Sequence, residues 1–169
     1  MSCPRTTTLS RRSHFRSYLR PKRLPDVLLQ TLKVVFCGLA AGNRSLASGA
    51  YYAQPGNRFW SALSQVGLTT RHLQPHDLLE LPKFGIGLTD LANKASETAT
   101  GLADSDYHIG SFARRMAQCG SKIIAFNGKE AAARFLQCRT GKKPSGFQLE
   151  RVGKPPIYVV PSASGMAFH

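Results

Sequence analysis

The segment from Phe36 to Trp60 combines residue types that build a small-molecule pocket. An apolar run ends at Gly38, and a series of small residues follows it. Such residues let a ligand approach the backbone closely. Tyr51 and Tyr52 then offer aromatic faces for stacking. Taken alone, this segment predicts a pocket for a small planar ligand.

A second reactive group stands at the end of another apolar run. Asp90 follows the residues FGIGLT and is one of only 9 acidic residues in the chain. A carboxylate in that position could orient or deprotonate a water molecule and stabilise a developing positive charge. The alternative is a turn or N-cap carboxylate that accepts a hydrogen bond from Asn93 or a nearby amide.

These groups need a scaffold, and the chain alternates predicted strands with predicted helices. Short apolar, β-branched runs predict strands, and apolar residues at helical spacing predict helices. The strands are expected at residues 33–39, 84–89, 122–126 and 157–160, and the helices at 58–66, 111–119 and 130–138. This alternation predicts the α/β class, with a mostly parallel central sheet covered on both faces. Such sheets bind ligands beyond the carboxyl ends of their strands.

Each predicted helix carries an apolar stripe that would pack on the sheet. On the first helix the stripe is Phe59, Leu63 and Val66, and Asn57 is its expected N-cap. The other two stripes are Phe112, Met116 and Cys119, and Ala132, Phe135 and Leu136.

The charge balance favours a polyanionic partner. Lys and Arg total 23 against 9 Asp and Glu, which gives a net charge of +14 and a pI of about 10.3. This surplus is typical of nucleic-acid-binding proteins, although a solvated basic surface would give the same count. Neither a membrane-spanning apolar run nor a secretory apolar region is visible in the sequence. A cytoplasmic protein is expected, associated with the nucleoid if it is bacterial.

The chain divides into a basic arm and one domain. Residues 1–25 hold seven basic residues, no acid and no sustained apolar period, so they predict a flexible arm that either contacts phosphates or is a dispensable tail. Residues 26–169 have the length of a single domain. The 4 Cys and 5 His residues lie without ligand spacing, so neither a metal site nor a cofactor is expected.

Three motifs resemble those of one enzyme family. The run FCGLAAGNRSLASGAYYAQPGNRFW at 36–60 is similar, without a gap, to the first motif of the mismatch-specific uracil-DNA glycosylases, the group of bacterial MUG and eukaryotic thymine-DNA glycosylase. YVVPSASGM at 158–166 is similar to the second motif, and FGIGLTDL at 84–91 to the G-V-T-x-L segment. The resemblance implies a three-layer sandwich like that of uracil-DNA glycosylase, in an enzyme that removes bases from DNA.

The resemblance also implies roles in a base-binding pocket. Tyr52 matches the aromatic residue on which the family stacks the extruded base, and Ser45 matches a serine of the pocket loop. Leu39 and Ala40 would offer backbone groups to the base, and Asn57 belongs to the same motif. However, Ala40 stands where the family has its catalytic Asn, whose side chain holds the attacking water.

An alanine methyl cannot hold water, so another side chain is expected to act. Asp90 is the main candidate, and it falls where the bacterial enzyme has a Lys beside the pocket. Asn43 is a lesser candidate, because loop Asn residues most often form turns. Ser162 replaces the Asn of the second motif, but a hydroxyl is a weak base.

The second motif implies a contact with DNA. Ser164, Gly165 and Met166 match the loop that enters the minor groove, with Met166 in place of a wedge Leu. An apolar wedge fills the gap left by a flipped nucleotide. Phe168 stands where the bacterial enzyme has Arg, so the same reading of the opposite guanine is not expected.

Together these features predict a monomeric, monofunctional glycosylase. It would flip uracil, or another deaminated or damaged pyrimidine, out of mismatched double-stranded DNA and hydrolyse its N-glycosidic bond. Two other classes stay open. One is a catalytically silent module that recognises mismatches or abasic sites. The other is a flavodoxin-like nucleotide-binding protein, against which the absence of a G-x-G-x-x-G or P-loop motif counts.

Overall fold

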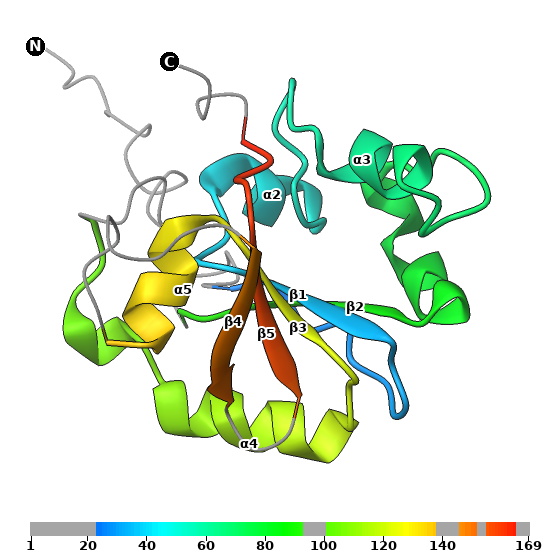
Figure 1. Cartoon of the computed structure of the whole chain (residues 1–169). Helices are drawn as coiled ribbons and strands as arrows, with labels where there is room; N and C mark the ends of the chain where they lie inside the picture. The colour runs from blue at the N-terminus through cyan, green and yellow to red at the C-terminus, as the bar shows by residue number, and fades with distance from the viewer. Residues whose placement is uncertain (1–22, 93–100, 138–145, 152–154, 165–169) are drawn as a thin grey trace, which may run out of the picture.

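A five-stranded sheet forms the centre of the molecule (Figure 1). The computed structural model describes residues 23–92, 101–137, 146–151 and 155–164. The strands are β1 (Val34–Gly38), β2 (Ile86–Asp90), β3 (Ile124–Asn127), β4 (Gly146–Arg151) and β5 (Pro156–Val160). Their order in the sheet is β2-β1-β3-β5-β4, and all neighbours are parallel except β4, which is antiparallel to β5. The predicted α/β class with a mostly parallel sheet is confirmed.

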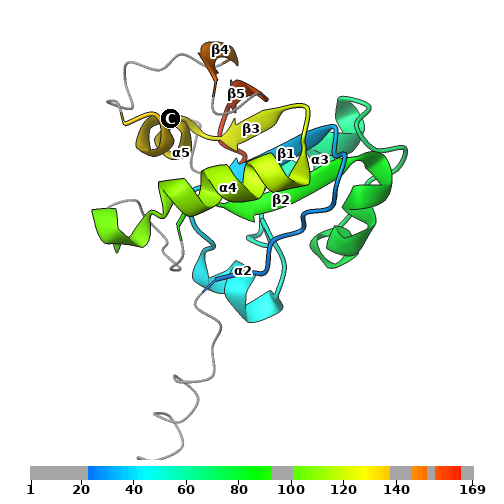
Figure 2. The same ribbon diagram turned by 90° about the horizontal axis from the view of Figure 1, so that it is seen from below.

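Helices connect the strands. Between β1 and β2 lie α2 (Asn43–Ser48), α3 (Phe59–Gln65) and the 3-10 helix η1 (Pro75–Phe84). Before β3 lie the short η3 (Asp104–Asp106) and α4 (Ile109–Cys119), and α5 (Lys129–Phe135) follows β3. Figure 2 shows α4 running across β1 and β2.

Both faces of the sheet are buried, because successive residues of a strand point to opposite sides. Val34 and Phe36 of β1 belong to one apolar cluster, and Val35 and Cys37 belong to the other. The first cluster takes in residues of α3 and η1, whereas the second takes in residues of α4 and α5. The fold therefore has three layers, with the sheet in the middle.

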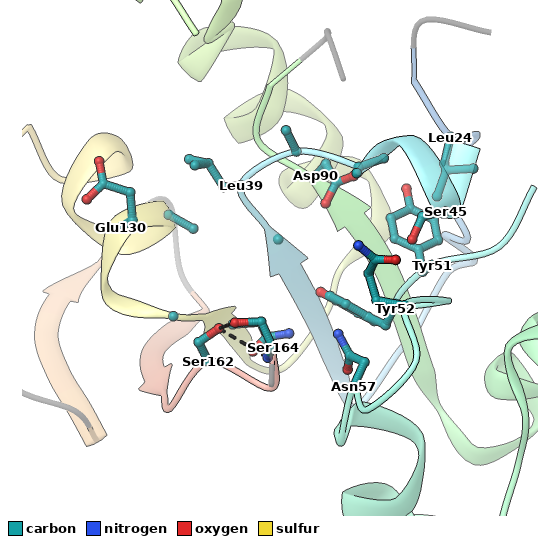
Figure 3. Close-up of a pocket in the computed structure, with 18 of the residues that line it drawn as sticks. Leu24, Leu39, Ser45, Tyr51, Tyr52, Asn57, Asp90, Glu130, Ser162 and Ser164 are labelled. Carbon is teal, nitrogen blue, oxygen red and sulfur yellow. Dashed lines mark hydrogen bonds between the residues drawn. The ribbon is translucent and has the colours of Figure 1, made fainter. Parts of the chain in front are cut away.

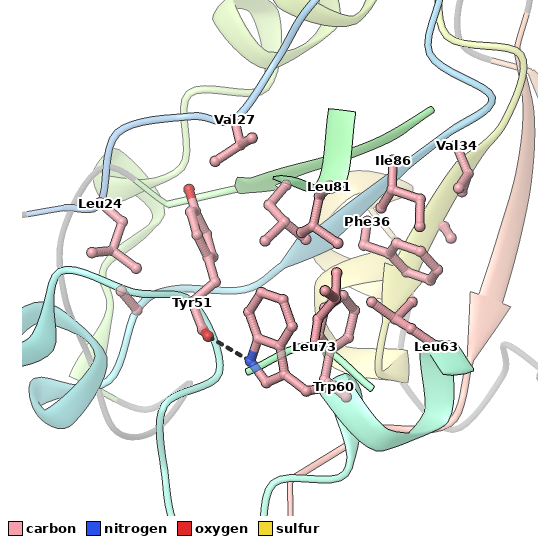
Figure 4. Packing of buried hydrophobic residues seen from close by; sticks show 14 residues of the cluster. Leu24, Val27, Val34, Phe36, Tyr51, Trp60, Leu63, Leu73, Leu81 and Ile86 are labelled. Carbon is pink, nitrogen blue, oxygen red and sulfur yellow. Dashed lines mark hydrogen bonds between the residues drawn. The ribbon is translucent and has the colours of Figure 1, made fainter. Parts of the chain in front are cut away.

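Aromatic rings fix the first cluster (Figure 4). The Phe59 ring lies edge-on to Phe36, with centroids 5.2 Å apart, and edge-on to Trp60 at 5.4 Å. Trp60 Nε1 donates a hydrogen bond to the Tyr51 carbonyl oxygen at 3.1 Å. Helix α3 is thus tied both to β1 and to the loop that carries Tyr51.

The second cluster has its own aromatic contacts. Phe112 of α4, Phe126 of β3 and Phe135 of α5 lie with ring centroids between 5.2 and 5.9 Å apart. Residues Phe112, Met116 and Cys119 are all buried, as their helical spacing predicted. This packing holds α4 and α5 against β3.

All four predicted strands and all three predicted helices are present, with ends shifted by a few residues. The inward stripe of α3 was wrong at Val66, which is 69% exposed, because the helix ends at Gln65 and the chain turns at Gly67 with φ 76°. Helix α2, helix η1 and strand β4 were not predicted.

The N-terminal arm lies mostly outside the described residues. Within it, Leu24 is only 2% exposed and packs in the first cluster, and Arg23 pairs with Asp26 at 3.1 Å. No helix in the described part of the chain is long and apolar enough to cross a membrane.

Two glycines of the fold should respond oppositely to replacement by alanine. A Cβ on Gly87 of β2 would lie 2.6 Å from Leu32 Cδ1 and 2.9 Å from the Val27 carbonyl oxygen. Gly87→Ala should therefore lower the free energy of unfolding by about 1–3 kcal/mol. A Cβ on Gly110 of α4 meets nothing within 4 Å.

Gly110→Ala is accordingly the matched control. It should leave stability unchanged or raise it by up to about 1 kcal/mol, because alanine favours helix more than glycine does. Urea unfolding followed by circular dichroism measures both variants. Equal stability of the two would contradict the close packing around Gly87.

Candidate active site

A cavity of about 730 Å³ opens at the carboxyl edge of the sheet (Figure 3). The ends of three parallel strands and the loop after β5 contribute Gly38, Asp90, Asn127 and Ser162 to its wall. In the sheet, β2 lies on one side of β1 and β3 lies on the other, so the connections from β1 run in opposite directions. The cavity therefore lies at the topological switch point, where such sheets bind ligands. Its position agrees with the prediction from the alternation of strands and helices.

Asp90 is the last residue of β2 and is paired in register with Gly38 of β1. It is only 8% exposed, yet it belongs to the cavity wall. A Cβ on Gly38 would overlap Asp90 Oδ1, so the carboxyl group uses the space that this glycine leaves open. Its Oδ2 is buried and has no hydrogen-bond partner among the described residues. Asn93, the partner expected if Asp90 were a turn or N-cap carboxylate, lies outside the described residues.

The environment makes Asp90 an unusually weak acid. Burial raises its pKa to about 7, the charge of Asp26 raises it as well, and Arg23 lowers it. Near neutral pH this group can therefore accept or release a proton, as a general base must.

Tyr52 lies beside Asp90 in the cavity wall. Its ring packs against Phe59 with centroids 4.2 Å apart, and its backbone is left-handed, with φ 56°. Its hydroxyl would lie 3.3 Å from a Cβ on Gly38, on the same side as the Asp90 carboxylate. Burial and the Asp90 charge raise the pKa of this hydroxyl, while Asn127 lowers it. The Tyr52 hydroxyl is therefore protonated near neutral pH, and its oxygen is buried in the cavity wall.

Two residues predicted to bind a base also hold the loop around Tyr52. Ser45 is 5% exposed, and its Oγ accepts a hydrogen bond from the Ala53 backbone N–H at 3.2 Å. Asn57 Oδ1 accepts one from the Phe59 N–H at 2.9 Å. Helix α3 begins at Phe59 with Arg58 in the cap position, one residue later than predicted, but the Asn57 side chain does bond its first turn. Both side chains line the cavity.

Leu39 and Ala40 form the part of the wall that follows β1. The Leu39 carbonyl oxygen already accepts a hydrogen bond from the Ala92 N–H at 2.8 Å. Ala40 is half-buried and contributes only a methyl group. The position of the expected catalytic Asn is thus on the cavity wall, but it has no polar side chain.

The loop after β5 joins the two motif regions. The Ala163 N–H donates to Asn127 Oδ1, and the Ala163 carbonyl accepts from the Arg58 N–H, both at 2.9 Å. Ser162 Oγ and Ser164 Oγ lie 2.9 Å apart within hydrogen-bonding distance. Ser162 and Ser164 therefore line the cavity beside Asn127, whereas Gly165, Met166 and Phe168 lie outside the described residues.

Asn127 was not identified from the sequence, although a signal existed. It ends the apolar run IIAF as Asp90 ends FGIGLT, and both are polar residues at carboxyl ends of strands. Asn43, a lesser catalytic candidate, is exposed at the start of α2 and is absent from the cavity wall. Among the described residues, no three His, Cys, Asp or Glu side chains gather into a metal-binding cluster.

A cavity with a buried carboxylate at the carboxyl edge of an α/β sheet defines an enzyme-like site. The chain belongs to the uracil DNA glycosylase superfamily, whose family model matches residues 25–169. Members of that superfamily are DNA glycosylases, which hydrolyse N-glycosyl bonds in DNA.

A solved structure supports the fold. The chain is similar to a candidate uracil DNA glycosylase from Methanosarcina acetivorans, whose solution NMR structure matches with a TM-score of 0.57. The sequences are 23% identical, and the match covers 85% of each chain. At that identity the likeness establishes the shared fold.

The buried carboxylate should make stability depend on pH. Because folding raises the pKa of Asp90 from an ordinary value of 3.8 to about 7, its contribution to stability is complete below pH 4 and is lost as pH rises through 7. Asp90→Asn stays neutral throughout. At pH 8 the free energy of unfolding of Asp90→Asn should therefore exceed that of the native chain, by an amount on the order of a few kcal/mol.

Chemical denaturation at pH 4.5 and pH 8 measures this difference. Asp104→Asn is the control, since the Asp104 side chain is 95% exposed, and it should show no comparable gain at pH 8. A gain for Asp90→Asn that is equal at both pH values would contradict the raised pKa.

Proposed function

We propose that this protein is a monofunctional glycosylase that removes uracil, and related deaminated or damaged pyrimidines, from mismatched double-stranded DNA. The observation that carries the proposal is the Asp90 carboxyl group, buried and without a partner for Oδ2 among the described residues, in the wall of the cavity. Superfamily membership supplies the reaction class. The motif resemblance supplies the substrate.

In the proposed reaction the nucleotide is flipped out of the duplex into the cavity. Ionised Asp90 orients a water molecule and stabilises the positive charge that develops on the sugar. The C1′–N1 bond breaks and its electron pair leaves with the base. The water oxygen then bonds to C1′, and its proton passes to the Asp90 carboxylate. The base anion takes up this proton, directly or through solvent, which restores the Asp90 carboxylate and leaves the free base and an abasic site.

The base would be held by one ring and a few polar groups. Tyr52 offers the stacking face and a hydroxyl donor. Asn127 Oδ1 already accepts from the Ala163 N–H, and the Asn127 side chain also interacts with the Tyr52 hydroxyl, so one N–H of its amide nitrogen is left to donate to a base carbonyl. Leu39 and Ala40 add backbone groups. So few side-chain contacts favour tolerance among uracil-like bases.

The duplex would be held outside the cavity. Ser164 at its rim leads into Gly165 and Met166, and an apolar Met166 wedge would replace the flipped nucleotide in the stack. The net charge of +14 supplies a non-specific attraction to phosphates. One catalytic domain binding one lesion needs no partner subunit, so we propose a monomer.

One observation favours a second function. Ala40 has no polar atom where the motif carries its catalytic Asn, and this would suit a silent module that binds mismatches or abasic sites. Base release separates the two functions. The protein, in excess, is incubated with duplexes that hold uracil opposite guanine or adenine, and abasic sites are then cleaved with alkali.

Cleavage that requires alkali would support a monofunctional glycosylase, with uracil opposite guanine released fastest. Binding in a gel shift without base release at pH 8 would instead support the silent module. Strand breaks without alkali, together with a borohydride-trapped protein–DNA adduct, would contradict the monofunctional assignment.

Asp90→Asn should slow single-turnover base release at least ~100-fold, the usual scale for loss of a general base. Binding to the uracil duplex should be retained, because the amide keeps the shape of the carboxyl group. Asp104→Asn, on the exposed surface, is the matched control and should keep the native rate. A native rate in Asp90→Asn would remove Asp90 from the mechanism.

Ala40→Asn should return part of the activity lost in Asp90→Asn. The new amide would stand in the cavity wall, where the motif places its water-binding Asn. We expect roughly tenfold recovery in the double mutant, equivalent to about 1.4 kcal/mol of barrier. Single-turnover release of uracil opposite guanine measures it. A folded, DNA-binding double mutant without recovery would show that residue 40 does not face the reacting bond.

A further inference from the structure

The backbone of Asp90 is hydrogen-bonded to a cluster of charged and polar residues, which consists of Arg23, Asp26, Thr89 and Arg115. Thr89 Oγ1 donates a hydrogen bond to Asp26 Oδ1 at 2.7 Å. Arg115 of α4 pairs with Asp26 Oδ2 through Nε at 3.2 Å and donates from Nη2 to the Asp90 carbonyl oxygen at 3.3 Å. Arg23 also pairs with Asp26 Oδ2, at 3.1 Å.

The cluster joins three separate parts of the chain. Asp26 lies before β1, and the next residue, Val27, exchanges two backbone hydrogen bonds with Leu88 of β2, at 2.8 and 3.0 Å. Arg115 belongs to α4, which follows β2 in the sequence. Asp26 therefore stands at a fixed place beside the end of β2.

The cluster is largely shielded from water. Thr89 is fully buried, and the side chains of Asp26 and Arg115 are only 15% and 20% exposed. Charges in such a position are weakly screened, so they act on one another more strongly than surface charges do. Arg23, at 39%, is the most exposed member.

We propose that Asp26 is a positioning residue for Asp90: held by Arg115 and Thr89, it fixes the end of β2 and places a negative charge near the Asp90 carboxyl group. This inference rests on the proposed function of Asp90. It assigns to Asp26 no contact with the substrate. Asp26 is not on the cavity wall.

The remaining groups around Asp90 do not replace this effect. Those that interact with it electrostatically are Cys37 on β1, Tyr51 and Tyr52 in the motif loop, and Asp26 and Arg23 before β1. Burial raises the pKa of Cys37 and of both tyrosines, so these three stay neutral near pH 7. Among the charged groups nearby, Arg115 binds the Asp90 carbonyl oxygen, whereas Asp26 and Arg23 shift the pKa of its carboxyl group in opposite directions.

The opposite effects of Asp26 and Arg23 on the pKa of Asp90 provide a test, because a purely structural role of Asp26 would not change that pKa in this way. Asp26→Asn keeps an oxygen for Thr89 but removes the negative charge, so the midpoint of Asp90 ionisation should fall, by roughly 0.5–1 pH unit. Arg23→Gln removes a positive charge, so the midpoint should rise. Arg23 is partly exposed, which makes this second variant the one more certain to fold.

Two measurements on the full chain separate the inference from the proposed function. The first is a ¹³C NMR titration of side-chain carboxyl groups in the free protein, with the Asp90 signal identified by its loss in Asp90→Asn. The second is the pH profile of single-turnover uracil release, which should rise with pH through the same midpoint. Asp104→Asn serves as the control and should change neither.

Opposite shifts of the Asp90 signal in the two variants, matched by the rate profiles, would support the inference. An Asp90 midpoint that stays unchanged in Arg23→Gln and in folded Asp26→Asn would overturn it. If the carboxyl signal shifts as expected while the rate profile does not, the role of Asp26 toward Asp90 stands and the proposed role of Asp90 as general base fails.

Discussion

The carboxyl group of Asp90 occupies space that exists only because residue 38 has no side chain. Parallel pairing of β1 and β2 brings these two residues into register at the last position of each strand. A Cβ at residue 38 would overlap Asp90 Oδ1 and approach the Tyr52 hydroxyl. A glycine at the end of β1 is therefore a condition for a carboxylate at the end of β2, and the rest of the site is arranged around that pair.

Burying this carboxylate opposes folding, since a charged group loses its hydration. The two apolar layers that enclose the sheet offset that cost. Trp60, Phe59 and Phe36 secure one face, and the Phe112, Phe126 and Phe135 rings secure the other. The stability of the core allows a destabilising group to be kept in the cavity. Active sites commonly contain residues that lower the stability of the fold in this way.

Much of the fold follows from local pattern. Strands β1 and β2 are short and buried throughout, and β3 nearly so, so they appear as apolar runs in the sequence. Helix α2, by contrast, has six residues and no apolar stripe, and η1 contains Pro82. Strand β4 (GFQLER) carries several polar residues and lies at the edge of the sheet, where it pairs with the next strand, β5. These elements therefore lack the uninterrupted apolar run or helical stripe on which the sequence predictions relied.

The same distinction applies to the site. The position of Asp90 in the cavity wall could be predicted, because a polar residue at the end of an apolar strand is a local signal, and Asn127 carries that signal too. The hydrogen bonds from Ala53 to Ser45 and from Ala163 to Asn127 were not predictable, because they join residues 8 and 36 positions apart. They show that motif residues that line the cavity also fix the shape of its loops.

Two positions on this cavity wall, Ala40 and Asp90, lie at the ends of neighbouring strands. Ala40 lies two residues beyond Gly38, and Asp90 is paired with Gly38, so both stand at the carboxyl edge of the same strand pair. Because parallel strands bring their carboxyl ends to one edge, a polar group at the end of either strand reaches the same cavity. A catalytic group can then move from one strand to its neighbour without any change in the fold, provided that the facing position stays small. Gly38 meets that condition, which makes an alanine at position 40 compatible with an active enzyme.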